Sequence, residues 1–207
     1  MHNLMARKKQ LLDRSSINSK RILALNKPKG YVVTRSDELG RKTVYDLLPD
    51  WGFRDGWMPV GRLDLESKGL LLFTTNGKYG DVLTTPGNCI KTYEIWVRGH
   101  VTDEHIAAAL KGVKSSGDLL KAIRLEKKGT GGAKTKLRIE IDEGKNRHIR
   151  RLFGALKDPK FGTPLKVLEL KRVGIGNFKP NLDTNLESGK WRYLSLEEEK
   201  RLMNRII

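Results

Sequence analysis

The sequence from residue 58 to residue 74 reads Met58-Pro59-Val60-Gly61-Arg62-Leu63-Asp64-Leu65-Glu66-Ser67-Lys68-Gly69-Leu70-Leu71-Leu72-Phe73-Thr74, and it decides the fold. The run from Leu70 to Phe73 is continuously apolar and follows a glycine, a pattern typical of a buried strand. A loop with four charged residues separates this strand from the apolar residues before it: Arg62, Asp64, Glu66 and Lys68. Loops held between rigid elements are frequent positions for functional residues. A lone acidic turn, however, more often serves only to cap backbone amides.

The composition indicates a protein that binds polyanions. The chain has 207 residues, of which 38% are hydrophobic, enough for one domain or two closely joined lobes with a sizeable core. Lys and Arg number 41 and Asp and Glu 24, so the formal net charge is +17. No apolar segment approaches the roughly 18 residues of a membrane helix, and the polar N-terminus lacks the apolar core of a secretory signal. We therefore expect a soluble cytoplasmic protein that acts on nucleic acid.

Residues 1–20 predict a flexible basic arm ahead of the folded domain. The segment has no sustained helical period and carries five basic residues: Arg7, Lys8, Lys9, Arg14 and Lys20. Such an arm suits non-specific contacts with phosphates, although an inert tail is an equally good interpretation. We expect one catalytic or binding domain over residues 21–207, with no separate module before it.

Hydrophobic patterns predict many strands and a few helices along the chain. Strands are expected at 22–25, 31–34, 91–97, 119–126, 137–141, 165–173 and 191–194. Helices are expected at 43–48, 77–83 and 102–112, after residue 148, and from Ser195 to Ile207, where Ser195 and Glu198 match a capping box. The segments 50–57 and 127–134 contain several glycines and are interpreted as loops. Polar and apolar residues alternate in most strands, which favours an α+β fold with an antiparallel sheet.

Four segments resemble motifs of the bacterial ribosomal RNA pseudouridine synthases, the group of small-subunit synthase A and large-subunit synthases B, E and F. Residues 61–75 resemble G-R-L-D-x-x-S-x-G-L-L-L-x-T-N, with the asparagine displaced to Asn76 by one extra threonine. Residues 26–30 resemble N-K-P-x-G, residues 91–93 resemble K-x-Y, and residues 144–151 resemble G-x-N-R-Q-(I/V)-R-R. His148 stands where that last motif has glutamine, which leaves the role of this position open.

The resemblance implies isomerisation of a specific uridine to pseudouridine in ribosomal RNA, of the large subunit, in a cleft across a mixed, mainly antiparallel sheet with flanking helices. It implies that Asp64 is the catalytic aspartate, that Tyr93 stacks on the target base and that Arg150 pairs with the aspartate. Six polar residues close to these three are expected to contact the RNA: Arg62, Lys91, Lys145, Asn146, Arg147 and Arg151. The resemblance implies no cofactor, and we expect a monomer.

The chemistry of the reaction requires residues of these types. Conversion of uridine breaks a glycosidic bond, rotates the base and rejoins it through a ring carbon, which calls for a carboxylate beside the anomeric centre. A neighbouring arginine favours the ionised carboxylate. A duplex hides the bond, so the uridine must be flipped out and its base stacked on an aromatic ring such as Tyr93. Whether Asp64 attacks the sugar or removes a sugar proton stays open.

Two other interpretations have to be weighed. His100, His105 and His148 lack both the one-turn helical spacing of a zinc pair and a cysteine pair, so we expect no metal site. A basic RNA-binding or ribosome-assembly protein without catalytic activity would also explain the charge and the aromatic residues. Asp64 argues against that alternative, because a pure binder gains nothing from an acid in a basic neighbourhood. About twenty residues precede Arg21, too few for the N-terminal RNA-binding module of many family members, which favours the compact branch of synthase E.

Overall fold

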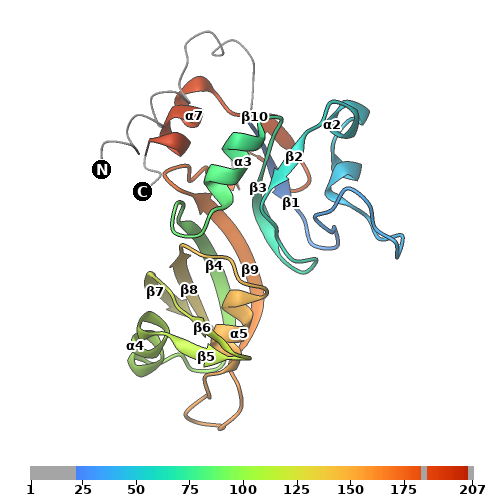
Figure 1. Ribbon diagram of the computed structural model, residues 1–207. Coiled ribbons are helices and arrows are strands. Elements are labelled where there is room, and N and C mark those ends of the chain that lie inside the picture. Colours follow the sequence, from blue (N-terminus) through green and yellow to red (C-terminus); the bar gives the residue numbers. More distant parts are fainter. Residues whose placement is uncertain (1–21, 183–185, 205–207) are drawn as a thin grey trace.

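A mixed, mainly antiparallel sheet runs through the molecule (Figure 1). The computed structural model describes residues 22–182 and 186–204, so the expected basic arm lies outside the described residues. In sheet order the strands are β10 (Trp191–Tyr193), β1 (Ile22–Lys27), β3 (Lys68–Thr74), β9 (Lys166–Ile175), β4 (Lys91–Arg98), β8 (Lys134–Ile141) and β7 (Arg124–Thr130), and β2 (Met58–Val60) pairs with β3. The β3–β9 pair is parallel and the other pairs of this sheet are antiparallel. The predicted fold class is confirmed.

Helices flank the sheet in two lobes, and the long curved strand β9 runs from one lobe to the other (Figure 1). The first lobe contains β1, β2, β3 and β10 together with the 3-10 helix η2 (Val44–Leu47) and the helices α2 (Asp50–Arg54), α3 (Gly77–Thr84) and α7 (Leu196–Met203). The second lobe contains β7 and β8, the hairpin β5 (Val113–Ser115) and β6 (Asp118–Leu120), and the helices α4 (Asp103–Lys111) and α5 (His148–Gly154). None of the described helices is long and apolar enough to span a membrane.

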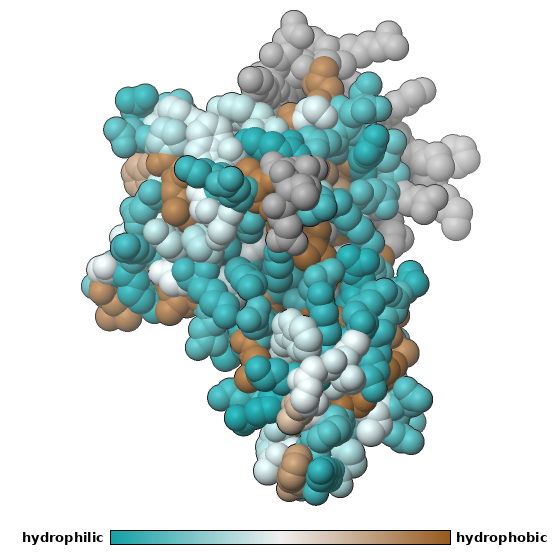
Figure 2. All heavy atoms as spheres, turned by 180° about the vertical axis from the view of Figure 1, so that it is seen from behind, coloured by the Kyte–Doolittle hydropathy of each residue, from teal (hydrophilic) through white to brown (hydrophobic). Residues whose placement is uncertain are grey.

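The central strands β1 and β3 are buried on both faces. Leu71 and Phe73 pack into one hydrophobic cluster with the interior of the second lobe, whereas Leu70 and Leu72 pack into another cluster on the opposite face. Successive side chains of a strand point to opposite faces, so burial of both faces requires a continuous apolar run. This explains the unbroken apolar sequence of residues 70–73. The outer surface differs: hydrophilic residues cover most of the face in Figure 2, and apolar residues form separate patches.

Strand β3 is the point where three other strands meet. On one side it pairs with β1, while on the other its first residues pair with β9 and its last residues pair with β2. Gly69 lies at the junction with a φ of +104°, and a Cβ there would clash with the main-chain carbonyl oxygen of Arg172. The close β3–β9 contact therefore requires glycine. The loop between β2 and β3 leaves the sheet at this junction, which places it over β9.

Two segments interpreted as loops contain regular structure. The predicted loop 50–57 contains helix α2, in which a Cβ on Gly52 would meet the side chain of Leu48 at 2.8 Å. Here glycine marks close packing rather than a loop, and Trp51 packs against Trp57 and Trp191. The predicted loop 127–134 belongs mostly to the β7–β8 hairpin, because pairing with β8 continues through Gly129 after an irregularity in register. Pairing with the next strand of the hairpin therefore keeps this glycine-containing segment extended.

Two predicted strands are also corrected. Residues 31–34 form only an isolated bridge, between Val32 and Thr43, because no neighbouring strand continues the pairing. The predicted strand 119–126 is interrupted between β6 and β7, where the amide of the buried Ala122 donates to the carbonyl of Ala109 in α4 at 2.9 Å. The capping box at Ser195 is confirmed, and α7 ends at Met203, while residues 205–207 lie outside the described residues.

Candidate active site

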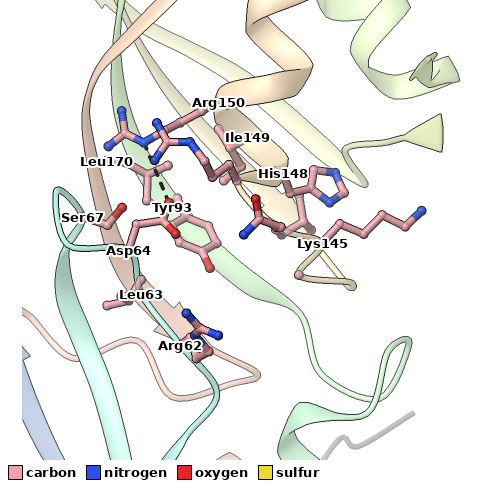
Figure 3. Close-up of a pocket in the computed structure, with 14 residues that line it drawn as sticks. Arg62, Leu63, Asp64, Ser67, Tyr93, Lys145, His148, Ile149, Arg150 and Leu170 are labelled. Atoms are coloured by element: carbon pink, nitrogen blue, oxygen red, sulfur yellow. Dashed lines mark ion pairs between the residues drawn. The ribbon is translucent and has the colours of Figure 1, made fainter. Parts of the chain in front are cut away.

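A cavity of about 230 Å³ lies where the β2–β3 loop meets β9 and the segment before α5. Its lining comes from distant parts of the chain: Arg62, Leu63, Asp64, Ser67, Tyr93, Ile141, Gly144, Lys145, Asn146, Arg147, His148, Ile149, Arg150 and Leu170. In Figure 3, Arg150 and Arg62 lie on opposite sides of Asp64, and the Tyr93 ring lies beside the carboxylate. The structure thus brings together Asp64, Tyr93 and Arg150, the three residues expected to be catalytic. We call this cavity the catalytic pocket.

Asp64 lies in a turn that is fixed by its main chain. The amide of Ser67 donates to the carbonyl of Asp64 at 2.9 Å, and the amide of Gly30 donates to the carbonyl of Leu65 at 2.9 Å. The Asp64 side chain is 35% exposed, so its carboxylate reaches the cavity. A functional group on a fixed main chain is held in position before a substrate arrives.

Lys27 lies beneath this turn and is fully buried. Its Nζ donates to the main-chain carbonyls of Pro28, Asp64 and Ser67, at 3.0, 3.2 and 2.9 Å. Burial lowers the pKa of Lys27 from 10.5 to about 8, although the nearby Asp64 carboxylate acts in the opposite direction. Because an ammonium group has three donors, all of them are used on the main chain. Lys27 therefore holds the turn that carries Asp64.

Arg172 on β9 supports the same loop at its two ends. Its side chain is buried, and Nε donates to the carbonyl of Leu70 at 2.7 Å while Nη1 donates to the carbonyl of Arg62 at 3.4 Å. Together, Lys27 and Arg172 bind four main-chain carbonyls of the segment from Arg62 to Leu70. Neither residue is among the site residues expected from the sequence, although Lys27 belongs to the segment that resembles N-K-P-x-G.

Arg150 approaches Asp64 from the opposite wall of the pocket. Its Nε lies 4.0 Å from Oδ2 of Asp64, an ion pair that Figure 3 marks with a dashed line. Its Nη1 lies 3.8 Å from Oε2 of Glu66. Nη1 also donates to the carbonyl of Val167 at 2.9 Å, which ties the side chain to β9. Burial lowers the pKa of Arg150, and the Glu66 carboxylate is the largest opposing influence. Among the described residues, Nε and Nη2 of Arg150 have no hydrogen-bond partner, so both donors are available for a better-aligned contact.

Tyr93 and four aliphatic side chains form the apolar part of the pocket. Tyr93 comes from β4 and is 7% exposed; the aliphatic residues are Leu170 from β9, Ile149 from α5, Ile141 from β8 and Leu63 from the β2–β3 loop. Tyr93, Ile95 and Val97 share a face of β4, and all three pack into one core cluster. An aromatic ring with aliphatic neighbours suits a flat ring system such as a base.

The other predicted RNA contacts divide into three groups. Four of them line the catalytic pocket: Arg62, Lys145, Asn146 and Arg147. Lys91 lines an adjoining cavity, and its Nζ donates to the carbonyl of Asp142 at 3.2 Å. Arg151 does not line the pocket: its Nη1 lies 2.8 Å from Asp118, and Nη2 donates to the carbonyl of Ser115. Arg151 therefore ties α5 to the β5–β6 hairpin.

His148, which replaces the expected glutamine, is buried at the start of α5. Its Nε2 contacts the carbonyl of Lys121 at 3.1 Å, and burial lowers the pKa of the ring below its usual value. A neutral ring with the proton on Nε2 fits this contact, because a carbonyl only accepts. His148 thus anchors the start of α5. Within residues 22–182 and 186–204, no group of three or more His, Cys, Asp or Glu is arranged to hold a metal ion.

The sheet and the pocket define the class of fold. A crystal structure of a pseudouridylate synthase superposes on this chain with a TM-score of 0.73 and 28% sequence identity, covering 88% of this chain and 73% of that one. The model of the RNA pseudouridylate synthase family matches residues 21–155. The chain therefore belongs to this family.

Curated relatives carry more specific names. The chain is 38% identical over 135 residues to ribosomal large subunit pseudouridine synthase B of Vibrio cholerae, covering 64% of this chain and 41% of the relative. It is 39% identical over 153 residues to the synthase B of Pseudomonas aeruginosa, covering 69% of this chain and 39% of the relative. The match thus spans about two fifths of the length of these relatives. Assignment to the branch of synthase E stays a prediction.

Proposed function

We propose that the chain converts one uridine of large-subunit ribosomal RNA to pseudouridine, with Asp64 as the catalytic aspartate. The observation that carries this proposal is the placement of the Asp64 carboxylate in the catalytic pocket, 4.0 Å from Arg150. The names of the relatives support both the reaction and the class of RNA.

The geometry suggests how the pocket acts. The target uridine is flipped out of its helix, and its base stacks on Tyr93 against Leu170. Asp64 then faces the sugar, where it acts either as a nucleophile or as a base while the glycosidic bond breaks. Arg150 holds the carboxylate ionised and oriented. The base turns within the pocket and rejoins the sugar through a ring carbon, so the overall reaction is an isomerisation.

The cations around the pocket bind the phosphates of the RNA. Arg62, Lys145 and Arg147 line the pocket beside Asn146, and Lys91 lies in the adjoining cavity. Positive side chains hold phosphates in a manner that weakens with salt. The basic segment 1–20 adds non-specific contacts of the same kind. We further propose that the protein acts as a cytoplasmic monomer and that residues 21–207 act as one domain.

Mapping pseudouridine in ribosomal RNA tests the proposal. RNA from cells with and without the gene is compared, and one site in the large subunit is expected to lose its modification. Wild-type protein should restore it, Asp64→Asn should not, and Asp103→Asn, an exposed control on α4, should restore it. Asp64→Asn should bind large-subunit RNA within about threefold of wild type, since the change removes charge but little volume.

The same experiment distinguishes the alternative function. If no site loses its modification and the protein still binds ribosomal RNA, the chain is a binding or assembly protein. If Asp64→Asn restores the site, Asp64 is not catalytic.

A further inference from the structure

A second, larger cavity adjoins the catalytic pocket. Its volume is about 950 Å³, and we call it the flanking chamber; it is lined by Lys29, Gly30, Leu65, Glu66, Arg98, Arg147, Arg150, Gly154, Thr163, Pro164, Leu165, Lys166, Val167 and Leu168. Arg147 and Arg150 line both cavities, so the two are neighbours. Strand β9 contributes residues 166–168 to the chamber and Leu170 to the catalytic pocket. The two cavities therefore follow one another along β9, and a polymer that lies along this strand extends from the pocket into the chamber.

The chamber is strongly positive. Its lining has one carboxylate, Glu66, and five cations: Lys29, Arg98, Arg147, Arg150 and Lys166. Within the described parts of the chain, the side chains of Lys29, Arg98 and Lys166 make no hydrogen bond or ion pair, and all three are exposed. By contrast, Lys68, Arg138 and Arg192 are each paired with a glutamate. Unpaired cations around one cavity attract a ligand with negative charge.

Arg147, which lines both cavities, has an unusual main-chain conformation. It has φ 49° and ψ 32° at the start of α5, a left-handed conformation that is strained for a residue other than glycine. Its side chain is 47% exposed and lies 3.9 Å from Glu66. Such strained positions cluster at functional sites, and here the strained residue contributes to the wall between the pocket and the chamber.

The chamber also offers apolar surface. Leu65 in the β2–β3 loop is 37% exposed, and Pro164 and Leu168 also line the chamber. A ligand that is anionic at one end and flat and partly apolar at the other fits this lining. A nucleotide has both properties, and a single-stranded chain can follow a positive groove with its bases on apolar surface.

We propose that the flanking chamber binds the nucleotide next to the target uridine in the RNA strand, with its phosphate on Lys29, Arg98 and Lys166. The inference rests on the proposed function for the identity of the RNA. The binding itself requires no catalytic step, so the two proposals can fail separately.

Binding of a defined probe to the full-length protein tests the chamber. The probe is a single-stranded oligouridylate of about nine nucleotides, used with the double variant Lys29→Glu/Lys166→Glu. We expect its dissociation constant to rise at least about tenfold at low salt, with the slope of log affinity against log salt smaller by about 0.7 for each phosphate that the variant no longer binds. The matched control is Lys111→Glu/Lys200→Glu, which makes the same charge change on exposed residues of α4 and α7. The control should raise the constant less than about threefold.

Photocross-linking gives a second, independent readout. An oligouridylate with thiouridine at alternate positions should cross-link to peptides containing residues 163–168 in wild-type protein, and this product should be absent from the double variant. Thermal unfolding of the variant close to that of wild type would exclude a folding defect. The proposal is wrong if the double variant binds like its control, or if wild type gives cross-links around Tyr93 and none in residues 29–30 or 163–168. Pseudouridine mapping reports on the proposed function separately, since it depends on Asp64 and not on the chamber.

Discussion

The two sides of the loop that carries Asp64 use positive charge in opposite ways. Beneath the loop, Lys27 is fully buried and its three donors bind main-chain carbonyls. On the side of the flanking chamber, Lys29 is exposed, and among the described residues its side chain has no hydrogen bond or ion pair. The two lysines are two residues apart. Lys27 below the loop thus holds the main chain that carries Asp64, whereas Lys29 above it remains available for a ligand with negative charge.

Arg150 combines both properties, because it lines the two cavities and its side chain is nevertheless mostly buried beside Asp64. Its removal should have the largest effect on the reaction rate. Arg150→Ala should lower the single-turnover rate on large-subunit RNA by about a thousandfold, since the variant has no preorganised charge next to the reacting group. RNA affinity should change less than about threefold. Arg150→Lys, which keeps the charge without the guanidinium fork, should recover part of the rate.

Lys27→Met tests the buried side of the comparison. It leaves the carbonyls of Asp64 and Ser67 without their buried donor, so the turn should shift and the single-turnover rate should fall about a hundredfold. RNA affinity should stay within about threefold of wild type. Lys29→Met is the matched control and should show the reverse, with weaker binding and a normal chemical step. If the two variants change the rate and the RNA affinity equally, the buried and the exposed lysine do not have different roles.

The pH dependence of the free energy of unfolding tests the burial of Lys27. Lys27 has a pKa of about 8 in the folded protein, below its ordinary 10.5. Between these values the unfolded chain binds a proton that the folded protein does not, so this residue makes the free energy of unfolding rise with pH. The rise should be on the order of 2 kcal/mol relative to Lys27→Met. Urea denaturation of both proteins at about pH 7 and about pH 10 measures it, and a constant difference between them would contradict the assignment.

Arg62→Ala should have the smallest effect. Arg62 is exposed at the mouth of the catalytic pocket, so its removal should weaken RNA binding about tenfold and reduce the salt slope by about 0.7 for one phosphate contact. The single-turnover rate at saturating protein should change little. If Arg62→Ala abolishes the rate while Arg150→Ala keeps it, the roles of the two arginines are reversed.

The sequence by itself determined the elements whose signals are local. The apolar run 70–73 predicted a buried strand, and the capping box at Ser195 predicted the start of α7. The motifs around Asp64, Tyr93 and Arg150 were sufficient to predict residues that line one pocket, although 86 positions separate Asp64 from Arg150. The alternating strands likewise predicted a mainly antiparallel sheet.

Tertiary structure alone decided which polar residues are buried and where each points. Lys27 belongs to a segment that has the composition of an exposed basic turn, yet it is fully buried, because the β1–β3 and β3–β9 pairings bring the catalytic loop over it. Arg151 stands next to Arg150 in the motif but lies on another side of α5 and pairs with Asp118. Burial and pairing of this kind depend on residues far away in the chain. A local pattern has no access to those residues, which is the physical reason why the roles of these cations became visible only in the folded molecule.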